Sequence, residues 1–121
     1  MAKNKILVVD DSPTDTMVIS NSLRAEGYEV ITARDGEEAL RRLDSDHPDL
    51  VLLDVVMPGK NGFQLCRQIR NDGRYNALPV ILLTSKSQEA DKFWGMKQGA
   101  TAYMTKPFAP DALLATVRQH V

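Results

Sequence analysis

Cysteine and histidine are both scarce in this sequence, which has one cysteine, Cys66, and two histidines. A single cysteine excludes an intramolecular disulfide and a thiolate-rich metal site, and it fits a reducing compartment. The histidines lie outside the motifs described below, which weighs against a serine or cysteine nucleophile that needs a histidine base. We therefore expect a cytoplasmic protein whose chemistry depends on other side chains.

Net charge and long hydrophobic runs are also lacking. The 121 residues include 15 basic and 16 acidic side chains, so the formal net charge is −1. Such a balance gives no overall electrostatic basis for binding nucleic acid or an anionic membrane. The apolar run near the N-terminus is short and polar residues follow it closely, so it is neither a signal peptide nor a membrane span. We predict no nucleic-acid partner and no membrane insertion.

Short apolar runs alternate with helical patterns from one end of the chain to the other. The composition, 43% hydrophobic and 26% charged, is that of a soluble globular protein, and the length suits one domain over residues 1–121. Strands that alternate with helices through short connections predict an α/β fold with a doubly wound parallel sheet. The expected strands are the apolar runs 6–9, 28–33, 50–53, 80–83 and 102–105.

Capping residues mark where the helices begin and end. Ser12 followed by Pro13 predicts an N-cap and a first helical position, and Pro110 predicts the start of the last helix. Asp35 and Glu38 have the spacing of a capping box. Glycines at positions 27, 73 and 99 are expected to end three of the helices.

Polar side chains gather where the apolar runs end. Asp10 and Asp11 follow the first run, Asp54 the third, Thr84 the fourth and Lys106 the fifth. The carboxyl ends of parallel strands meet at one edge of the sheet, where open α/β sheets hold their ligands. In the flavodoxin-like strand order 2-1-3-4-5, the first and third strands are neighbours, which brings Asp10, Asp11 and Asp54 together.

Three carboxylates in one place repel one another and need a cation. Oxygen ligands without histidine or cysteine favour a hard ion, and Mg²⁺ suits a shallow site because it keeps several waters and accepts one or two carboxylates plus a phosphate oxygen. Lys106 supplies a positive charge for a phosphoryl oxygen, and Thr84 supplies a hydroxyl donor. Asp54 is then a nucleophile that forms an acyl phosphate, and an ionised carboxylate needs no general base for that attack.

Together these motifs resemble the receiver domains of two-component response regulators, the CheY-like family. The resemblance covers essentially the whole chain and rests on the segments 9–12, 54–62, 83–85 and 99–108, which occur in the family's order and spacing. It implies a flavodoxin-like (βα)5 fold in one domain, with strand order 2-1-3-4-5. It also implies that a histidine kinase donates the phosphoryl group and that the chain acts as a signalling switch rather than as an enzyme.

The resemblance assigns roles to the residues at the sheet edge. Asp54 would be the phosphoacceptor, and Lys106 would bind the phosphoryl group. Asp10 and Asp11 would be the carboxylates on the Mg²⁺ side, and Val56 would be a further metal ligand through its backbone carbonyl.

The same resemblance implies a switch. Thr84 would be the switching hydroxyl that moves toward the phosphoryl oxygens, and Tyr103 would be the switch aromatic that turns inward. The peptide bond between Lys106 and Pro107 would be cis. From the residues alone, Tyr103 is either core filling or a switch residue, because a tyrosine combines an apolar ring with a polar tip.

A narrower likeness concerns residues on helix surfaces. Segments 11–14, 61–64 and 91–100 resemble the stand-alone receivers of pilus-associated, twitching-motility or phototaxis chemosensory systems, the PilH type. This likeness implies a role in type IV pilus motility or chemotaxis-type signalling, with a downstream motility or signalling protein as partner and a monomer or weak dimer as the assembly. Adjacent Phe93 and Trp94 cannot both face the core from one narrow helix face, so Trp94 is either packed or partly exposed on a protein-binding surface near Tyr103.

Some alternatives stay open at this stage. Val56 and Lys86 occupy positions that the family uses to tune hydrolysis, so the lifetime of the phosphoryl group is undetermined, and a phosphate sink is an alternative to a messenger. A small Mg²⁺-dependent phosphohydrolase that uses an aspartyl phosphate would need a second Asp two residues after Asp54, which this sequence lacks. A flavodoxin-like FMN carrier would need a Ser/Thr-rich phosphate loop where the chain has Asp10 and Asp11.

Overall fold

The uninterrupted apolar runs form a parallel sheet at the centre of the molecule. In the computed structural model, which describes residues 4–121, five strands pair in the order β2-β1-β3-β4-β5, and every pairing is parallel. The predicted fold and strand order are therefore confirmed. The strands are β1 (Lys5–Val9), β2 (Glu29–Ala33), β3 (Leu50–Leu53), β4 (Val80–Thr84) and β5 (Ala102–Thr105).

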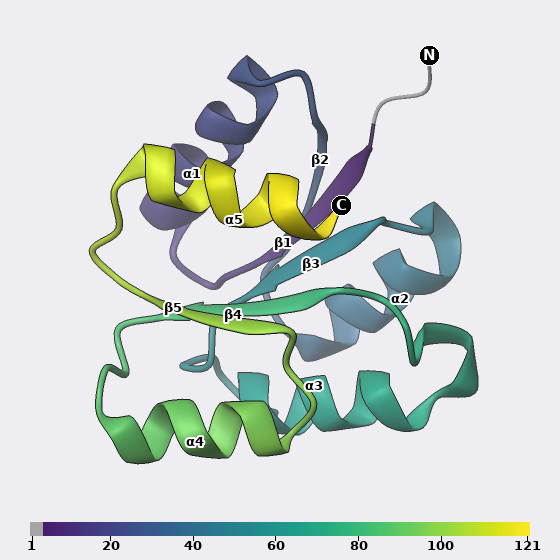
Figure 1. Ribbon diagram of the computed structural model, residues 1–121. Coiled ribbons are helices and arrows are strands. Elements are labelled where there is room, and N and C mark those ends of the chain that lie inside the picture. The colour runs from purple at the N-terminus through teal and green to yellow at the C-terminus, as the bar shows by residue number, and fades with distance from the viewer. Residues whose placement is uncertain (1–3) are drawn as a thin grey trace.

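Helices cover both faces of this sheet (Figure 1). Helices α1 and α5 lie on one face, whereas α2, α3 and α4 lie on the other. The described helices are α1 (Pro13–Ala25), α2 (Gly36–Asp46), α3 (Gly62–Asn71), α4 (Glu89–Lys97) and α5 (Pro110–His120), and a short 3₁₀ helix, η1 (Gly73–Tyr75), follows α3. The sequence analysis did not anticipate η1.

The central strands contribute side chains to two hydrophobic core clusters, one on each face of the sheet. This explains why apolar and polar residues do not alternate along them. All four residues of β3 are buried. Val51 and Leu53 pack into the cluster that contains residues of α2 and α3, whereas Leu50 and Leu52 pack into the cluster that contains residues of α1 and α5. A strand with helices on both faces needs an apolar residue at every position, and this requirement produces the continuous runs seen in the sequence.

Most of the predicted helix caps are present. Ser12 Oγ accepts a hydrogen bond from the Asp15 N–H at 3.3 Å, and Pro13 is the first residue of α1. Asp35 accepts from the Glu38 N–H at 2.9 Å, but the Glu38 carboxylate accepts from the N–H of residue 34 instead of closing the predicted box. A complete capping box forms at Asn61, where the sequence analysis did not place one. The peptide bond between residues 106 and 107 is cis, as the family resemblance implied.

Arg70 ties the end of α3 to the turn before β5. Its Nε donates to the Gly99 carbonyl at 2.6 Å, and one terminal nitrogen donates to Thr101 Oγ1 at 3.0 Å. The other terminal nitrogen donates to the backbone carbonyls of Tyr75, at 3.1 Å, and Leu78. One guanidinium therefore satisfies three backbone carbonyls and a hydroxyl in two separate connections, α3–β4 and α4–β5, because its planar fork presents donors in several directions.

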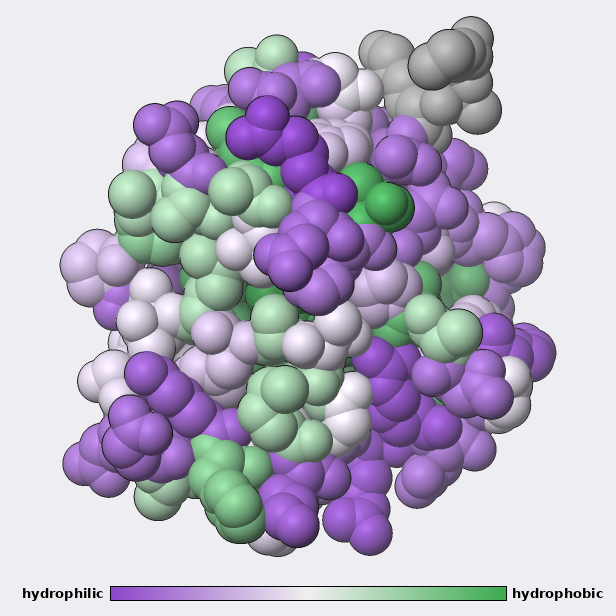
Figure 2. Space-filling model, viewed as in Figure 1, coloured by the Kyte–Doolittle hydropathy of each residue, from purple (hydrophilic) through white to green (hydrophobic). Residues whose placement is uncertain are grey.

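Helix α4 presents its large apolar side chains to solvent. Phe93, Trp94 and Met96 are 64%, 52% and 47% exposed, whereas Gly95 is the buried residue of this helix. Figure 2 shows a largely hydrophilic face with hydrophobic side chains at its lower edge, where Figure 1 places α4. The expectation that Phe93 and Trp94 cannot both be buried is confirmed. Within residues 4–121, no helix is long and apolar enough to cross a membrane.

Gly62 brings the start of α3 against the end of β3. Its N–H donates to the Val55 carbonyl at 2.9 Å. A Cβ at this position would lie 2.7 Å from the Val55 Cα and closer still to the Asp54 carbonyl oxygen. Because the obstructing atoms belong to the backbone, α3 reaches this position only with a residue that has no side chain.

We predict that Gly62→Ala lowers the free energy of unfolding by more than about 2 kcal/mol, since the added methyl group would displace the segment that holds Asp54. Urea denaturation followed by circular dichroism measures this difference. Gly73→Ala is the matched control, because no described atom lies within 4 Å of a Cβ built there. If Gly62→Ala and Gly73→Ala are equally stable, the close approach at Gly62 has no energetic importance.

Candidate functional site

The carboxyl edge of the sheet gathers the predicted side chains. Asp10 and Asp54 directly follow β1 and β3, Thr84 ends β4, and Lys106 follows β5. The backbone keeps them in register, because the Asp54 N–H donates to the Val9 carbonyl at 2.9 Å and the Lys106 N–H donates to the Thr84 carbonyl at 2.9 Å. The site is therefore built on strand ends, and backbone hydrogen bonds to the neighbouring strands hold Asp54 and Lys106 in place.

Lys106 contacts three carboxylates and so connects the side chains of this site. Its Nζ donates to Asp10 Oδ2 at 2.7 Å, to Asp15 Oδ2 at 2.8 Å and to Asp54 Oδ2 at 3.1 Å. The side chains of Lys106, Asp10 and Asp54 are 14%, 2% and 10% exposed, so these charges are largely removed from water. An ammonium has three N–H donors, and each of them has a carboxylate partner here.

Asp15 is a member of this site that the sequence analysis missed. It lies in the first turn of α1, three residues after the N-cap Ser12, where an acidic side chain usually folds back onto the cap. Its side chain instead reaches Lys106 and is 44% exposed, so it forms the outer rim of the site. The Ser12-to-Asp15 spacing is visible in the sequence, but it signals a capping box and gives no indication of a contact with Lys106.

Asp10, Asp11 and Asp54 form a cluster of oxygen ligands. One carboxylate oxygen from each lies within 4.8 Å of the others, and Asp11 is exposed while its two neighbours are buried. This donor set contains oxygen alone, and one side of it is open to water, which fits a hard divalent cation that keeps part of its water shell. The residues present thus suit Mg²⁺.

Burial and hydrogen bonding oppose each other in the electrostatics of the site. Burial raises the pKa of Asp10 above its usual value, although hydrogen bonds from Lys106 and from the Ser12 N–H counteract the shift. Burial by itself lowers the pKa of Lys106, but hydrogen bonds to Asp10 and Asp15 outweigh it, so the Lys106 pKa lies above its usual value. Lys106 is therefore positively charged at neutral pH, and its charge opposes the rise in the Asp10 pKa that burial causes.

Asp54 is held in one orientation by contacts on both of its carboxylate oxygens. Oδ1 accepts a hydrogen bond from the Val56 N–H at 3.2 Å, and Oδ2 accepts from Lys106 at 3.1 Å. The Val56 side chain points outward and is 53% exposed. Assignment of the Val56 carbonyl as a metal ligand stays a prediction.

Thr84 and Tyr103 are connected through the backbone of Lys86. Thr84 is fully buried, and its Oγ1 accepts a hydrogen bond from the Lys86 N–H at 3.4 Å. The Tyr103 hydroxyl donates to the Lys86 carbonyl at 2.7 Å. A displacement of the Thr84 hydroxyl would therefore be felt by Tyr103 through one residue of the β4–α4 loop.

Tyr103 already lies against α4 in this structure. Two of its ring carbons are 2.8 and 2.9 Å from the place where a Cβ on Gly95 would stand, so the ring fits there because residue 95 is glycine. Burial, together with the negative charges of Asp91 and Asp54, raises the pKa of Tyr103 to about 12. The phenol thus stays protonated at neutral pH and remains a hydrogen-bond donor.

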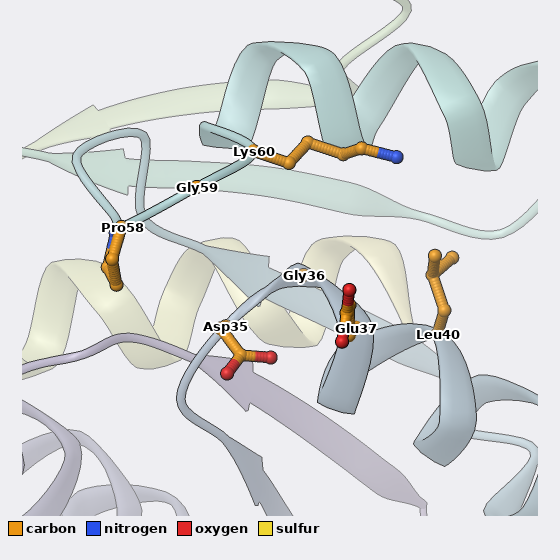
Figure 3. Close-up of a pocket in the computed structure, with 7 residues that line it drawn as sticks. All are labelled: Asp35, Gly36, Glu37, Leu40, Pro58, Gly59 and Lys60. Carbon is orange, nitrogen blue, oxygen red and sulfur yellow. The ribbon is translucent and has the colours of Figure 1, made fainter.

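A separate pocket of about 500 Å³ lies between the start of α2 and the β3–α3 loop (Figure 3). The Lys60 side chain passes over Gly36 there, and its ammonium contacts Gln68. None of the predicted site residues lines this pocket, whose lining is Asp35, Gly36, Glu37, Leu40, Pro58, Gly59 and Lys60.

Three comparisons place this geometry among known proteins. Protein PilH of Pseudomonas aeruginosa is 45% identical over 113 residues, which are 93% of this chain and 93% of PilH. The regulatory protein PhoP of Bacillus subtilis, named for alkaline phosphatase synthesis, is 44% identical over 94% of this chain but only 47% of its own length. The chemotaxis protein CheY4 of Vibrio cholerae superposes with a TM-score of 0.93 at 37% identity, covering 99% of this chain and 100% of CheY4.

The family assignment agrees with the fold and with the acidic edge of the sheet. Residues 6–118 match the response regulator receiver domain. The match spans all five strands and the residues that surround Lys106. The chain therefore belongs to the receiver domain family of two-component response regulators and is similar to PilH and CheY proteins.

Proposed function

We propose that Asp54 accepts a phosphoryl group from the phosphohistidine of a histidine kinase, and that this modification changes the protein's binding surface. The observation that carries the proposal is the contact of Lys106 with both Asp54 and Asp10, beside the exposed carboxylate of Asp11. A cation and a buried nucleophile are then in contact at the place where a phosphoryl group would arrive.

In the proposed step, a carboxylate oxygen of Asp54 forms a bond to phosphorus while the bond to the donor's leaving group breaks. Asp54 attacks as the ionised carboxylate, so no base has to remove a proton. Lys106 lies at hydrogen-bonding distance from Asp54 and can hold an oxygen of the incoming phosphoryl group. This pre-positioned charge stabilises the negative charge of the transition state without reorganisation.

Asp10, Asp11 and Asp54 would hold Mg²⁺, with the Val56 carbonyl as a further ligand. When bound, Mg²⁺ neutralises charge on the phosphoryl oxygens. Asp10 and Asp11 would hold the ion beside Asp54, and Lys106, which contacts both Asp10 and Asp54, would supply a second positive charge there. This division of roles accounts for why so many acidic groups surround a site that receives an anion.

The proposed switch runs from Thr84 to Tyr103. A phosphoryl group adds acceptor oxygens next to β4, and the Thr84 hydroxyl can turn toward them. The Lys86 N–H then loses its acceptor, and the loop that carries the acceptor of Tyr103 shifts. Since Tyr103 lies against Gly95, the shift reaches α4 and its exposed apolar side chains.

We infer that residues 1–121 act as one receiver domain whose output is a separate protein. The similarity to PilH over 93% of both chains supports a role in type IV pilus motility or chemotaxis-type signalling. The proposed partners are a histidine kinase and a downstream motility or signalling protein, and a monomer or weak dimer suffices for this role. A phosphate sink that drains a shared kinase would use the same site chemistry.

We favour a switch over an enzyme that acts on an external substrate. A phosphohydrolase working through an aspartyl phosphate needs an acid or base beside the nucleophile, and two residues after Asp54 the chain presents the apolar, exposed side chain of Val56. The protein would take part in its own phosphorylation and dephosphorylation without turning over phosphomonoesters.

The proposed phosphoacceptor can be tested by chemical phosphorylation. Incubation with acetyl phosphate and Mg²⁺ should label the protein, and Asp54→Ala should reduce labelling by at least about 100-fold because the nucleophile is lost. Intact-protein mass spectrometry measures the incorporation, and EDTA should abolish it.

Asp111→Ala is the control for removal of one carboxylate, since Asp111 is an exposed residue in the first turn of α5. It should be labelled as the unmodified protein is. Equal labelling of Asp54→Ala and the unmodified protein would show that the phosphoacceptor has been assigned to the wrong residue.

The second prediction concerns the switch. Tyr103→Phe removes the hydrogen bond to Lys86, which contributes about 0.5–1.5 kcal/mol, and should weaken the coupling between Asp54 and α4 by about two- to tenfold without slowing phosphorylation. The single tryptophan, Trp94 on α4, reports this coupling as a change in fluorescence on phosphorylation. Tyr28→Phe, in the core cluster on the other face of the sheet, is the control. An unchanged fluorescence response in Tyr103→Phe would contradict the proposed route.

A further inference from the structure

A cavity opens beside Lys106. It measures about 500 Å³ and lies between the start of α1 and the loop that joins β5 to α5. Its lining combines apolar side chains with one cation and one anion, and consists of Asp15, Val18, Ser85, Lys106, Pro107, Phe108 and Pro110. A small molecule or a side chain that occupied this cavity would meet the Lys106–Asp15 ion pair in its wall.

Asp15 and Asp54 face each other across the Lys106 ammonium. Their Oδ2 atoms lie 2.8 and 3.1 Å from the same nitrogen, so these two oxygens are at most about 6 Å apart. The Asp54 side chain is 10% exposed and that of Asp15 is 44% exposed, which places Asp15 on the outer side of the pair. A leaving group that lies on the Lys106 side of Asp54 would therefore be close to the Asp15 carboxylate.

The proposed chemistry does not otherwise require Asp15. Asp10, Asp11 and Asp54 provide the ligands for Mg²⁺, and Lys106 provides the contact to the phosphoryl group. Asp15 adds a third negative charge to Lys106, and this charge would repel an anionic donor. This repulsion would slow phosphorylation unless it differs between one class of phosphoryl donor and another.

We propose that Asp15 is a specificity-determining residue that favours phosphoryl donors with a nitrogen leaving group over donors with a carboxylate leaving group. This inference rests on the proposed function of Asp54. The Asp15 carboxylate attracts the protonated nitrogen of a phosphoramidate-type donor, and it repels the negative charge that develops when a carboxylate departs.

The two reactions differ in what leaves. With phosphoramidate, an oxygen of Asp54 bonds to phosphorus, the P–N bond breaks, and the nitrogen keeps the electron pair and departs as neutral ammonia because it already carries the extra proton. With acetyl phosphate, the same bond forms, the bond between phosphorus and the acetyl oxygen breaks, and acetate departs as an anion. Only the second reaction places a new negative charge on the leaving group, next to Asp15.

Asp15→Asn tests the proposal because it keeps the size of the side chain and removes its charge. We expect kcat/KM for acetyl phosphate, relative to that for phosphoramidate, to rise about five- to tenfold at low ionic strength, the effect of one unit charge at a partly exposed site. The rise should shrink in high salt, because salt screens exposed charges. Release of Lys106 from one partner acts on both donors alike, so the ratio isolates the interaction with the leaving group.

Two variants serve as controls. Asp15→Glu keeps the negative charge and should keep the ratio within about twofold of that of the unmodified protein. Glu37→Gln removes a carboxylate from the first turn of α2 and should leave the ratio unchanged. Circular dichroism confirms that each variant is folded before rates are compared.

The outcomes distinguish donor selection by Asp15 from phosphorylation of Asp54. A salt-sensitive rise in the ratio for Asp15→Asn alone supports donor selection by Asp15. Equal changes with both donors, or a rise of the same size in Asp15→Glu, would overturn it while leaving Asp54 as the phosphoacceptor. If neither donor labels the unmodified protein, both the donor selection and the proposed function of Asp54 are wrong.

Discussion

The ammonium of Lys106 makes the acidic edge of this sheet possible. Asp10 and Asp54 are almost entirely withdrawn from water, and two buried carboxylates at this distance would repel each other strongly without a cation between them. Lys106 follows β5, which ends level with β4, so its side chain starts at the same edge of the sheet as Asp10 and Asp54. It reaches them across β4 and β3, which lie between β5 and β1. The strand order is thus what brings a compensating positive charge to these two buried carboxylates.

Much of the architecture follows from local features of the sequence. Strands β3 and β4 are covered on both faces, so they are continuous apolar runs that a reader can delimit to within one residue. Ser12, Pro13 and Pro110 mark helix starts because their preferences are set by backbone chemistry rather than by distant contacts. The clustering of Asp10, Asp11 and Asp54 follows from strand order alone, which is why it could be predicted without coordinates.

Features that depend on which of several possible partners a side chain contacts could not be predicted from the sequence. Asp15 could have closed a capping box at Ser12, and only the position of Lys106 in space decides otherwise. Arg70 gives no local sign that it binds the Gly99 carbonyl, which lies 29 residues further along the chain. The ring of Tyr103 lies against Gly95 and its hydroxyl is bonded to the Lys86 carbonyl, and its inward turn on phosphorylation stays a prediction. These contacts are tertiary, and sequence spacing carries no information about them.

The burial of a glycine where α4 meets the sheet has a consequence for motion. A helix that inserts leucines or phenylalanines between its neighbours is locked in place, because tilting it breaks many dispersion contacts at once. Helix α4 inserts no large side chain at Gly95, where its backbone lies close to the side chains of Leu82 and Tyr103. A leucine in this place would add dispersion contacts that a tilt of α4 has to break, and a glycine adds none. At this point of the interface, the resistance of α4 to tilting therefore comes from its neighbours' side chains and from none of its own.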